Sequence, residues 1–118
     1  MSLIDLLPSD ATLAQVPPGH VIFAQGDRGE LMYVVLEGEA QILLDGKAVE
    51  TVRSGGIVGE MALIDAGPRS ATAIAKTRCV LIAIDETKFA ELVSRRPDFA
   101  LEVMRTLAHR LRRMDVER

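Results

Sequence analysis

A glutamate and an arginine, separated by a short apolar segment and a turn, are the residues of this chain best suited to chemistry. Glu60 follows Gly59, and Arg69 follows the rigid Gly67-Pro68 step. A guanidinium presents a planar fork of donors that matches phosphate oxygens in a bidentate way. An ionised carboxylate accepts hydrogen bonds, including those that sugar hydroxyls donate. These two side chains could therefore bind a sugar phosphate together.

Glycines shape the backbone around this pair. Gly55, Gly56 and Gly59 allow sharp turns and a close approach to another group. The apolar residues Met61–Ile64 could then form one helical turn whose first amide groups attract an anion. The segment thus predicts an anion cradle of backbone amides beside the guanidinium. The residue types alone leave a simpler alternative open, in which the carboxylate and the guanidinium form a surface ion pair on an ordinary loop.

The first two-thirds of the chain alternates short segments rich in Val, Ile and Leu with turn sequences. The Asp45-Gly46 pair between two such segments predicts a tight hairpin, because primed turns need positive φ angles. Short strands without long helices between them favour an antiparallel sandwich or barrel over βαβ units. The predicted strands are His20–Ala24, Leu31–Leu36, Ala40–Leu44, Val49–Val52, Ser70–Ala75 and Cys79–Ile84.

The last third changes to a helical period. Asp85 is a suitable N-cap for a short helix that ends near Ser94, and Pro97 suits the first turn of a second helix that ends near Met114. Apolar residues recur along the second helix at spacings of three and four, a pattern typical of a helix that packs on a partner. The partner is either the chain's own barrel or a second copy in a homodimer. These residues are Ala100, Met104, Leu107, Leu111 and Met114.

The same helix is basic. We expect its charges to form a solvated face that is favourable near a helix C-terminus. A residue that caps a bound base, or a surface for an acidic partner, is the alternative. The residues concerned are Arg105, His109, Arg110, Arg112 and Arg113.

Composition narrows the class of protein. A chain of 118 residues is expected to form one domain, and a formal net charge of −3 does not indicate nucleic-acid binding. The single Cys79 excludes an internal disulfide and suits a small buried hydrophobe in a reducing cytosol. Neither a signal peptide nor an apolar run long enough to span a bilayer is evident. We therefore expect a cytoplasmic protein without a membrane partner.

The sequence contains few residues that could catalyse a reaction. His20 and His109 are the only histidines, whereas a metal-dependent barrel enzyme needs several inward-facing histidine and carboxylate ligands. No Ser-His-Asp or Cys-His set can be assembled with a plausible third partner. We expect no metal, no cofactor and no catalytic residue, and a metal-dependent enzyme is the least favoured alternative.

The segment from Gly59 to Thr72 resembles the phosphate-binding cassette of the cyclic nucleotide-binding domain family, which includes catabolite activator proteins and protein kinase A regulatory subunits. The family pattern is Gly-Glu, a few apolar residues, a short loop, and Arg-(Ser/Thr/Ala)-Ala-Thr. Here the two halves are Gly59-Glu60-Met61-Ala62-Leu63 and Pro68-Arg69-Ser70-Ala71-Thr72. The resemblance extends upstream and downstream and covers roughly Pro18 to Met114.

The resemblance implies a fold. It is a mainly β, antiparallel jelly-roll β-barrel (a double-stranded β-helix) with flanking α-helices, including a long C-terminal helix. The whole chain, 1–118, would be one domain, with the barrel over about 15–84 and the C-terminal helices over about 86–116. The helical segment before the barrel would be shortened to Ile4–Ala14. Because the chain ends where the activators begin their DNA-binding segment, we expect no nucleic-acid partner.

The resemblance also implies a role for each cassette residue. Glu60 would accept the ribose 2′-hydroxyl, and Arg69 would pair with the cyclic phosphate. The Ser70 hydroxyl or amide, together with backbone amides near Met61, would complete the anion cradle. The full set of expected ligand contacts is Val58, Gly59, Glu60, Met61, Ala62, Arg69, Ser70 and Ala71.

The base pocket is less defined. Ile42, Val49 and Val52 align with apolar positions that line the pocket in the family, and an ordinary core role fits them equally well. The pair that contacts adenine in the activators aligns with Met114-Asp115, so the choice between adenine and guanine stays open. Of the two possible ligands, cAMP is favoured over cGMP.

The resulting hypothesis is a stand-alone regulatory module that binds a 3′,5′-cyclic nucleotide and is not an enzyme. It would signal to an unidentified effector protein by movement of its C-terminal helix. The alternative is a ligand-free scaffold of the same fold that uses this helix for assembly.

Overall fold

The protein consists of two antiparallel sheets and flanking helices. The structure is a computed structural model, and it describes residues 3–65 and 67–116. The first sheet has the strand order β1-β8-β3-β6. Its strands are β1 (Thr12–Val16), β8 (Cys79–Asp85), β3 (Leu31–Glu37) and β6 (Ile57–Val58). The central strands β8 and β3 are mostly buried, which explains their nearly continuous apolar sequences.

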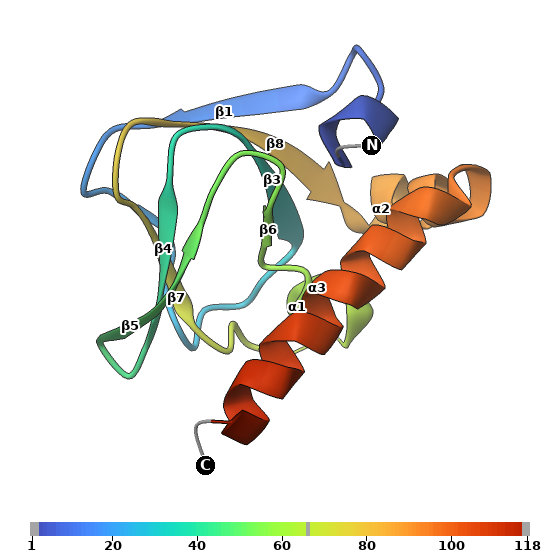
Figure 1. Ribbon diagram of the computed structural model, residues 1–118. Coiled ribbons are helices and arrows are strands. Elements are labelled where there is room, and N and C mark those ends of the chain that lie inside the picture. The colour runs from blue at the N-terminus through green and yellow to red at the C-terminus, as the bar shows by residue number, and fades with distance from the viewer. Residues whose placement is uncertain (1–2, 66, 117–118) are drawn as a thin grey trace.

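The second sheet has the order β2-β7-β4-β5 and carries the predicted hairpin (Figure 1). Its strands are β2 (Val21–Phe23), β7 (Thr72–Ala75), β4 (Ala40–Leu44) and β5 (Lys47–Val52). The turn between β4 and β5 has positive φ angles at both central residues, 52° at Asp45 and 81° at Gly46. The hairpin prediction is therefore confirmed, together with the mainly β, antiparallel class.

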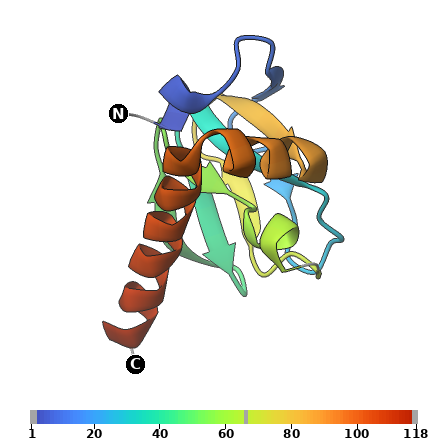
Figure 2. The ribbon, with the colours of Figure 1, turned by 90° about the vertical axis from the view of Figure 1, so that its right-hand side faces the viewer.

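Helices flank the strands at both ends of the chain. The 3₁₀ helix η1 (Leu3–Leu6) precedes β1, and α2 (Glu86–Arg95) and α3 (Pro97–Val116) follow β8. Asp85 caps α2, because its Oδ1 accepts a hydrogen bond from the Lys88 amide at 2.8 Å. Figure 2 shows α3 extending from the end of α2 alongside the strands. The predicted cap and both predicted helices are confirmed.

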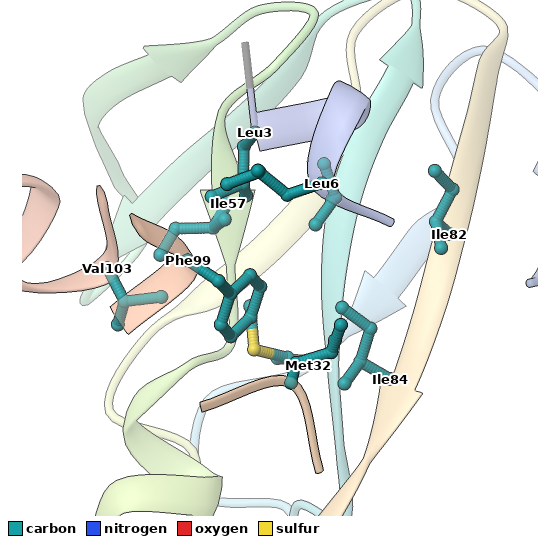
Figure 3. Close-up of a cluster of buried hydrophobic side chains, with 10 residues drawn as sticks. Leu3, Leu6, Met32, Ile57, Ile82, Ile84, Phe99 and Val103 are labelled. Carbon is teal, nitrogen blue, oxygen red and sulfur yellow. The ribbon is translucent and has the colours of Figure 1, made fainter. Parts of the chain in front are cut away.

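One apolar cluster holds these helices on the first sheet. Phe99 and Val103 of α3 are buried with Met32 of β3 and Ile57 of β6 (Figure 3). Phe99 also meets Phe89 of α2 edge to face, with ring centroids 5.7 Å apart. Leu3 and Leu6 of η1 complete the cluster.

A second apolar cluster draws residues from both sheets. It contains Val58 of β6, Val52 of β5 and Cys79 of β8. Cys79 is fully buried, as expected for a small hydrophobe, and burial raises the pKa of its thiol. The thiol donates a hydrogen bond to the Glu39 carbonyl oxygen at 3.2 Å.

The structure corrects the expectation for the N-terminal segment. A helical region over Ile4–Ala14 was predicted, but only η1 is helical and Thr12–Val16 form strand β1. Strand β1 pairs with the edge of β8 that β3 leaves open, from Thr12 opposite Ala83 to Val16 opposite Cys79. Hydrogen bonds along this edge outweigh local helical preference. Strand β6 was also missed, since two residues are too short to show a period.

The apolar stripe of α3 is divided between the core and solvent. Leu107 packs against the first cluster, and Ala100 is half-buried. Met104 and Leu111 are 56% and 62% exposed. The side chain of Met114 lies outside the described residues. Self-association through this stripe stays a prediction. Over residues 3–65 and 67–116, no helix combines the length and apolar character needed to cross a membrane.

Replacement of Phe99 tests the anchoring of α3. Phe99→Ala should lower the free energy of unfolding by about 3–5 kcal/mol, because it removes a fully buried ring. Urea denaturation followed by circular dichroism measures the change. Leu101→Ala is the matched control on the same helix, and since Leu101 is exposed it should change stability by no more than about 0.5 kcal/mol. Equal losses in the two variants would contradict the assigned packing.

Candidate functional site

The cassette runs from β6 through a single helical turn to Arg69. The turn is α1 (Met61–Ile64), and it matches the predicted helical turn. Gly59 precedes it with a φ of 79°, a conformation that side-chain-bearing residues rarely adopt. A Cβ atom at Gly59 would lie 2.5 Å from Nη1 of Arg69, so this position requires glycine for space as well as for conformation.

Glu60 is buried at the start of α1, with 3% of its surface exposed. Its backbone carbonyl accepts hydrogen bonds from the Leu63 and Ile64 amides at 3.0 and 3.2 Å. Its side chain makes no capping hydrogen bond to the helix. Instead, Oε1 accepts a hydrogen bond from Nη1 of Arg110, a residue of α3. The carboxylate therefore faces α3 and not the solvent.

Arg69 is also buried, with 7% of its surface exposed. Its Nη1 donates to the Gly59 carbonyl at 3.1 Å, and its Nη2 donates to the Leu31 carbonyl at 2.7 Å. The guanidinium carbon lies 4.0 Å from the centroid of the Phe23 ring, a cation–π contact. Its Nε is buried without a hydrogen-bond partner. A Cβ atom at Gly29 would lie 2.6 Å from this Nε, so the guanidinium fits closely into its surroundings.

The backbone of Arg69 is fixed by the turn that follows β2. The Arg69 amide donates to the Asp27 carbonyl at 2.7 Å, and the Arg69 carbonyl accepts from the Gly26 amide at 2.8 Å. These bonds keep the chain at Arg69 away from the β4–β7 ladder. They explain why β7 begins at Thr72 and not at the predicted Ser70.

Within the described residues, no carboxylate lies within 4.0 Å of the Arg69 guanidinium. Burial lowers the pKa of Arg69, and the more distant carboxylates of Asp27 and Glu60 act in the opposite direction. The surface ion pair that the sequence left open is therefore not formed. Glu60 and Arg69 are both buried, and the carbonyl of Gly59, the residue before Glu60, accepts a hydrogen bond from the Arg69 guanidinium. A buried cation with only neutral partners is suited to receive an anion.

Arg110 is the main site residue that sequence analysis missed. It was expected on a solvated face, but its side chain is only 21% exposed and binds Glu50 as well as Glu60. Burial opposes its charge, but the hydrogen bonds and charges of these two carboxylates raise the pKa of Arg110 overall. The spacing contained a signal, because Phe99, Val103 and Arg110 follow one another at helical intervals on the side that faces the sheet.

The other predicted contacts lie around the cassette. Met61 and Ser70 are exposed, and Ala62 and Ala71 are half-buried. A cavity of about 670 Å³ borders the cassette on the side of the β2–β3 loop and the start of α2. Ala62 and Pro68 line this cavity, whereas Glu60 and Arg69 do not. The space beside the Glu60 carboxylate is instead occupied by the Arg110 guanidinium.

The predicted base-pocket residues differ in their surroundings. Val52 belongs to the second core cluster, and Ile42 packs at its border. Val49 is 37% exposed and is the extra residue where the β4–β5 register shifts. Met114 and Asp115 continue the backbone of α3, but their side chains lie outside the described residues. Their contact with a base stays a prediction.

The proteins similar to this chain include a cyclic AMP receptor protein and a protein kinase regulatory subunit. A cyclic AMP receptor protein from Thermus thermophilus is 34% identical over 119 aligned positions, covering 97% of this chain and 55% of the relative. A cAMP-dependent protein kinase regulatory subunit from Eremothecium gossypii is 40% identical over 78 residues, covering 66% of this chain and 17% of the relative. The chain thus spans about half the length of the first and a small part of the second.

Solved structures and a family model agree with these relatives. The crystal structure of the Thermus thermophilus catabolite activator protein matches with a TM-score of 0.84 and 33% identity, covering 98% of this chain and 56% of that one. The family model described as "Cyclic nucleotide-binding domain" matches residues 13–96, which is more than half of the chain and includes the whole cassette. This chain therefore belongs to the cyclic nucleotide-binding domain family.

Proposed function

We propose that this chain is a regulatory module that binds a 3′,5′-cyclic nucleotide and does not catalyse a reaction. The observation that carries the proposal is the buried guanidinium of Arg69, which has carbonyl partners, an unpartnered Nε and no carboxylate within 4.0 Å among the described residues. A cyclic phosphate would supply the missing negative charge and accept bidentate hydrogen bonds.

The second half of the ligand would meet Glu60. A ribose 2′-hydroxyl can donate a hydrogen bond to a carboxylate, and Glu60 has a second oxygen besides the one that accepts from Arg110. Its burial strengthens such a bond, because water does not compete for the oxygen. The cassette would thus bind the sugar through Glu60 and the phosphate through Arg69.

We favour cAMP over cGMP as the ligand. The names of two relatives, a cyclic AMP receptor protein and a cAMP-dependent protein kinase regulatory subunit, support this choice. They also support a regulatory role. A location in the cytoplasm and the absence of catalysis stay predictions. Ile42, Val49 and Val52 would contribute apolar surface near the base.

The signal would leave through α3. Arg110 connects this helix to Glu60, so a ligand that engages Glu60 changes the surroundings of α3. The ligand can shift α3 only by the difference in its affinity for two arrangements of the helix. The exposed Met104 and Leu111 would offer a surface for a second copy of the chain or for an effector protein.

Replacement of Arg69 tests the phosphate contact. Arg69→Ala should weaken cAMP binding by about 2–5 kcal/mol, or roughly thirtyfold to several-thousandfold, because a buried phosphate would lose its charged partner. Arg69→Lys should rescue little, since an ammonium cannot make the planar two-point contact. Isothermal titration calorimetry with cAMP and cGMP measures both effects and ranks the bases.

Arg53→Ala is the control for this experiment, because Arg53 is exposed and pairs with Glu39 away from the cassette. It should bind cAMP as the parent does. An Arg69→Ala protein with unchanged affinity would refute the assigned site. Flat titrations of the parent at millimolar cAMP and cGMP would favour the scaffold alternative.

A ligand without the 2′-hydroxyl tests the role of Glu60. Replacement of cAMP by 2′-deoxy-cAMP should weaken binding to the parent about tenfold to a hundredfold, as for the loss of a hydrogen bond to a charged acceptor. Glu60→Ala should lose a similar factor towards cAMP and should not distinguish the two ligands. Losses that simply multiply would show that Glu60 and the hydroxyl do not interact.

A further inference from the structure

Glu50 lies outside the cassette, yet it binds the arginine that holds Glu60. Its Oε1 accepts from Nε of Arg110 at 2.9 Å, and its Oε2 accepts from Nη2 of Arg110 at 3.2 Å. The side chain of Glu50 is only 20% exposed. Two parallel hydrogen bonds between a carboxylate and a guanidinium define an orientation as well as a charge pair.

The planarity of the guanidinium links the two carboxylates. With Nε and Nη2 bound to Glu50, the plane of the guanidinium is fixed, and the remaining nitrogen Nη1 donates to Glu60. Nη2 also donates to the Ile57 carbonyl of β6 at 2.6 Å. Arg110 thereby bridges β5, β6 and the cassette from its place on α3.

A second arginine strengthens the attachment of α3 to β5. Arg113 lies three residues after Arg110, on the same face of the helix. Its Nη2 donates to the Val49 carbonyl at 2.6 Å, and its Nη1 lies 3.6 Å from Oε1 of Glu50. Val49 is the extra residue of the β4–β5 register shift, so its position gives β5 an irregular edge that faces α3.

The charges around Arg110 make Glu50 more than a surface partner. Glu50, Glu60 and Arg110 are all largely shielded from solvent. Arg110 thus pairs with both carboxylates, and Arg113 adds a second positive charge beside Glu50, in a setting where an unbalanced charge is costly. If Arg110 loses its two hydrogen bonds to Glu50, its remaining hydrogen bonds within residues 3–65 and 67–116 are one to Glu60 and one to the Ile57 carbonyl.

We propose that Glu50 is a positioning residue that orients Arg110, and thereby holds the Glu60 carboxylate ready for a ribose hydroxyl and α3 against β5. The ligand step of this inference rests on the proposed function. The attachment of α3 does not, because every contact that supports it joins residues of this chain to one another.

Hydrogen exchange of the ligand-free protein tests the attachment of α3. Glu50→Gln keeps the shape of the side chain but removes its charge and one acceptor oxygen. Amides over residues 105–113 should exchange about tenfold faster or more, as expected for the loss of charge-assisted hydrogen bonds. Amides around Phe99, which the apolar core holds, should keep their rates.

Glu39→Gln is the matched control, because Glu39 also pairs with an arginine, Arg53, but does not contact α3. It should leave exchange over residues 105–113 unchanged. Unchanged exchange in Glu50→Gln would overturn the proposed attachment.

A double-mutant cycle tests the ligand step. Glu50→Gln should weaken cAMP binding about tenfold through the disturbed Arg110, by the usual size of a charged hydrogen bond. In an Arg110→Gln background, Glu50→Gln should cause no further loss, because its effect passes through the missing guanidinium. Calorimetry of the parent, both single variants and the double variant measures this coupling.

The outcomes separate this inference from the proposed function. A parent that binds cAMP, with independent losses for Glu50→Gln and Arg110→Gln, would overturn the positioning role and leave the proposed function intact. A parent that binds no cyclic nucleotide would overturn the proposed function and the ligand step together. The exchange rates would still decide whether Glu50 holds α3.

Discussion

The buried positive charge of Arg69, which is surrounded by neutral groups, constrains how the segments around it pack. The Arg69 guanidinium lies against the Phe23 ring and donates to two backbone carbonyls. A cation taken from water without a counter-ion loses solvation that carbonyl dipoles only partly replace. The fold tolerates this cost because the turn at Gly26-Asp27 fixes the backbone of Arg69 on both sides. Under the proposed function, a bound phosphate would supply the ion pair that this guanidinium does not make with a carboxylate of the described residues.

The long C-terminal helix has two kinds of attachment. Its first turns are held by Phe99 and Val103 in an apolar core. Its later turns are held by Arg110 and Arg113 through ion pairs and carbonyl contacts. Apolar contacts respond weakly to a change of charge nearby, whereas the ion pairs share the Glu60 carboxylate with the cassette. Under the proposed function, a change at the cassette would act on the later turns and leave the first turns in place.

Local signals predicted much of this fold, and long-range pairing explains what they missed. Asp45-Gly46 indicated the β4–β5 hairpin because the turn needs positive φ angles that few residues adopt. Thr12–Val16 gave no such signal, since the strand forms only where the edge of β8 is available. Glu60 and Arg69 alone left a surface ion pair open, and the expectation of a cassette came from the family resemblance of the segment that contains them. The spacing of Arg110 indicated the inward face of its helix but not its two carboxylate partners, because they lie 60 and 50 positions away in sequence.

Gly29 and Gly59, which lie beside Arg69, limit the substitutions that this chain tolerates. A methyl group at Gly29 or Gly59 would occupy the volume that the guanidinium now fills, with contacts of 2.6 and 2.5 Å to its nitrogens. The arginine would have to leave its place, although neither mutated residue carries a side chain that could touch a ligand. Under the proposed function, one added Cβ atom at Gly29 or Gly59 would thus impair ligand binding, although neither apolar cluster would change.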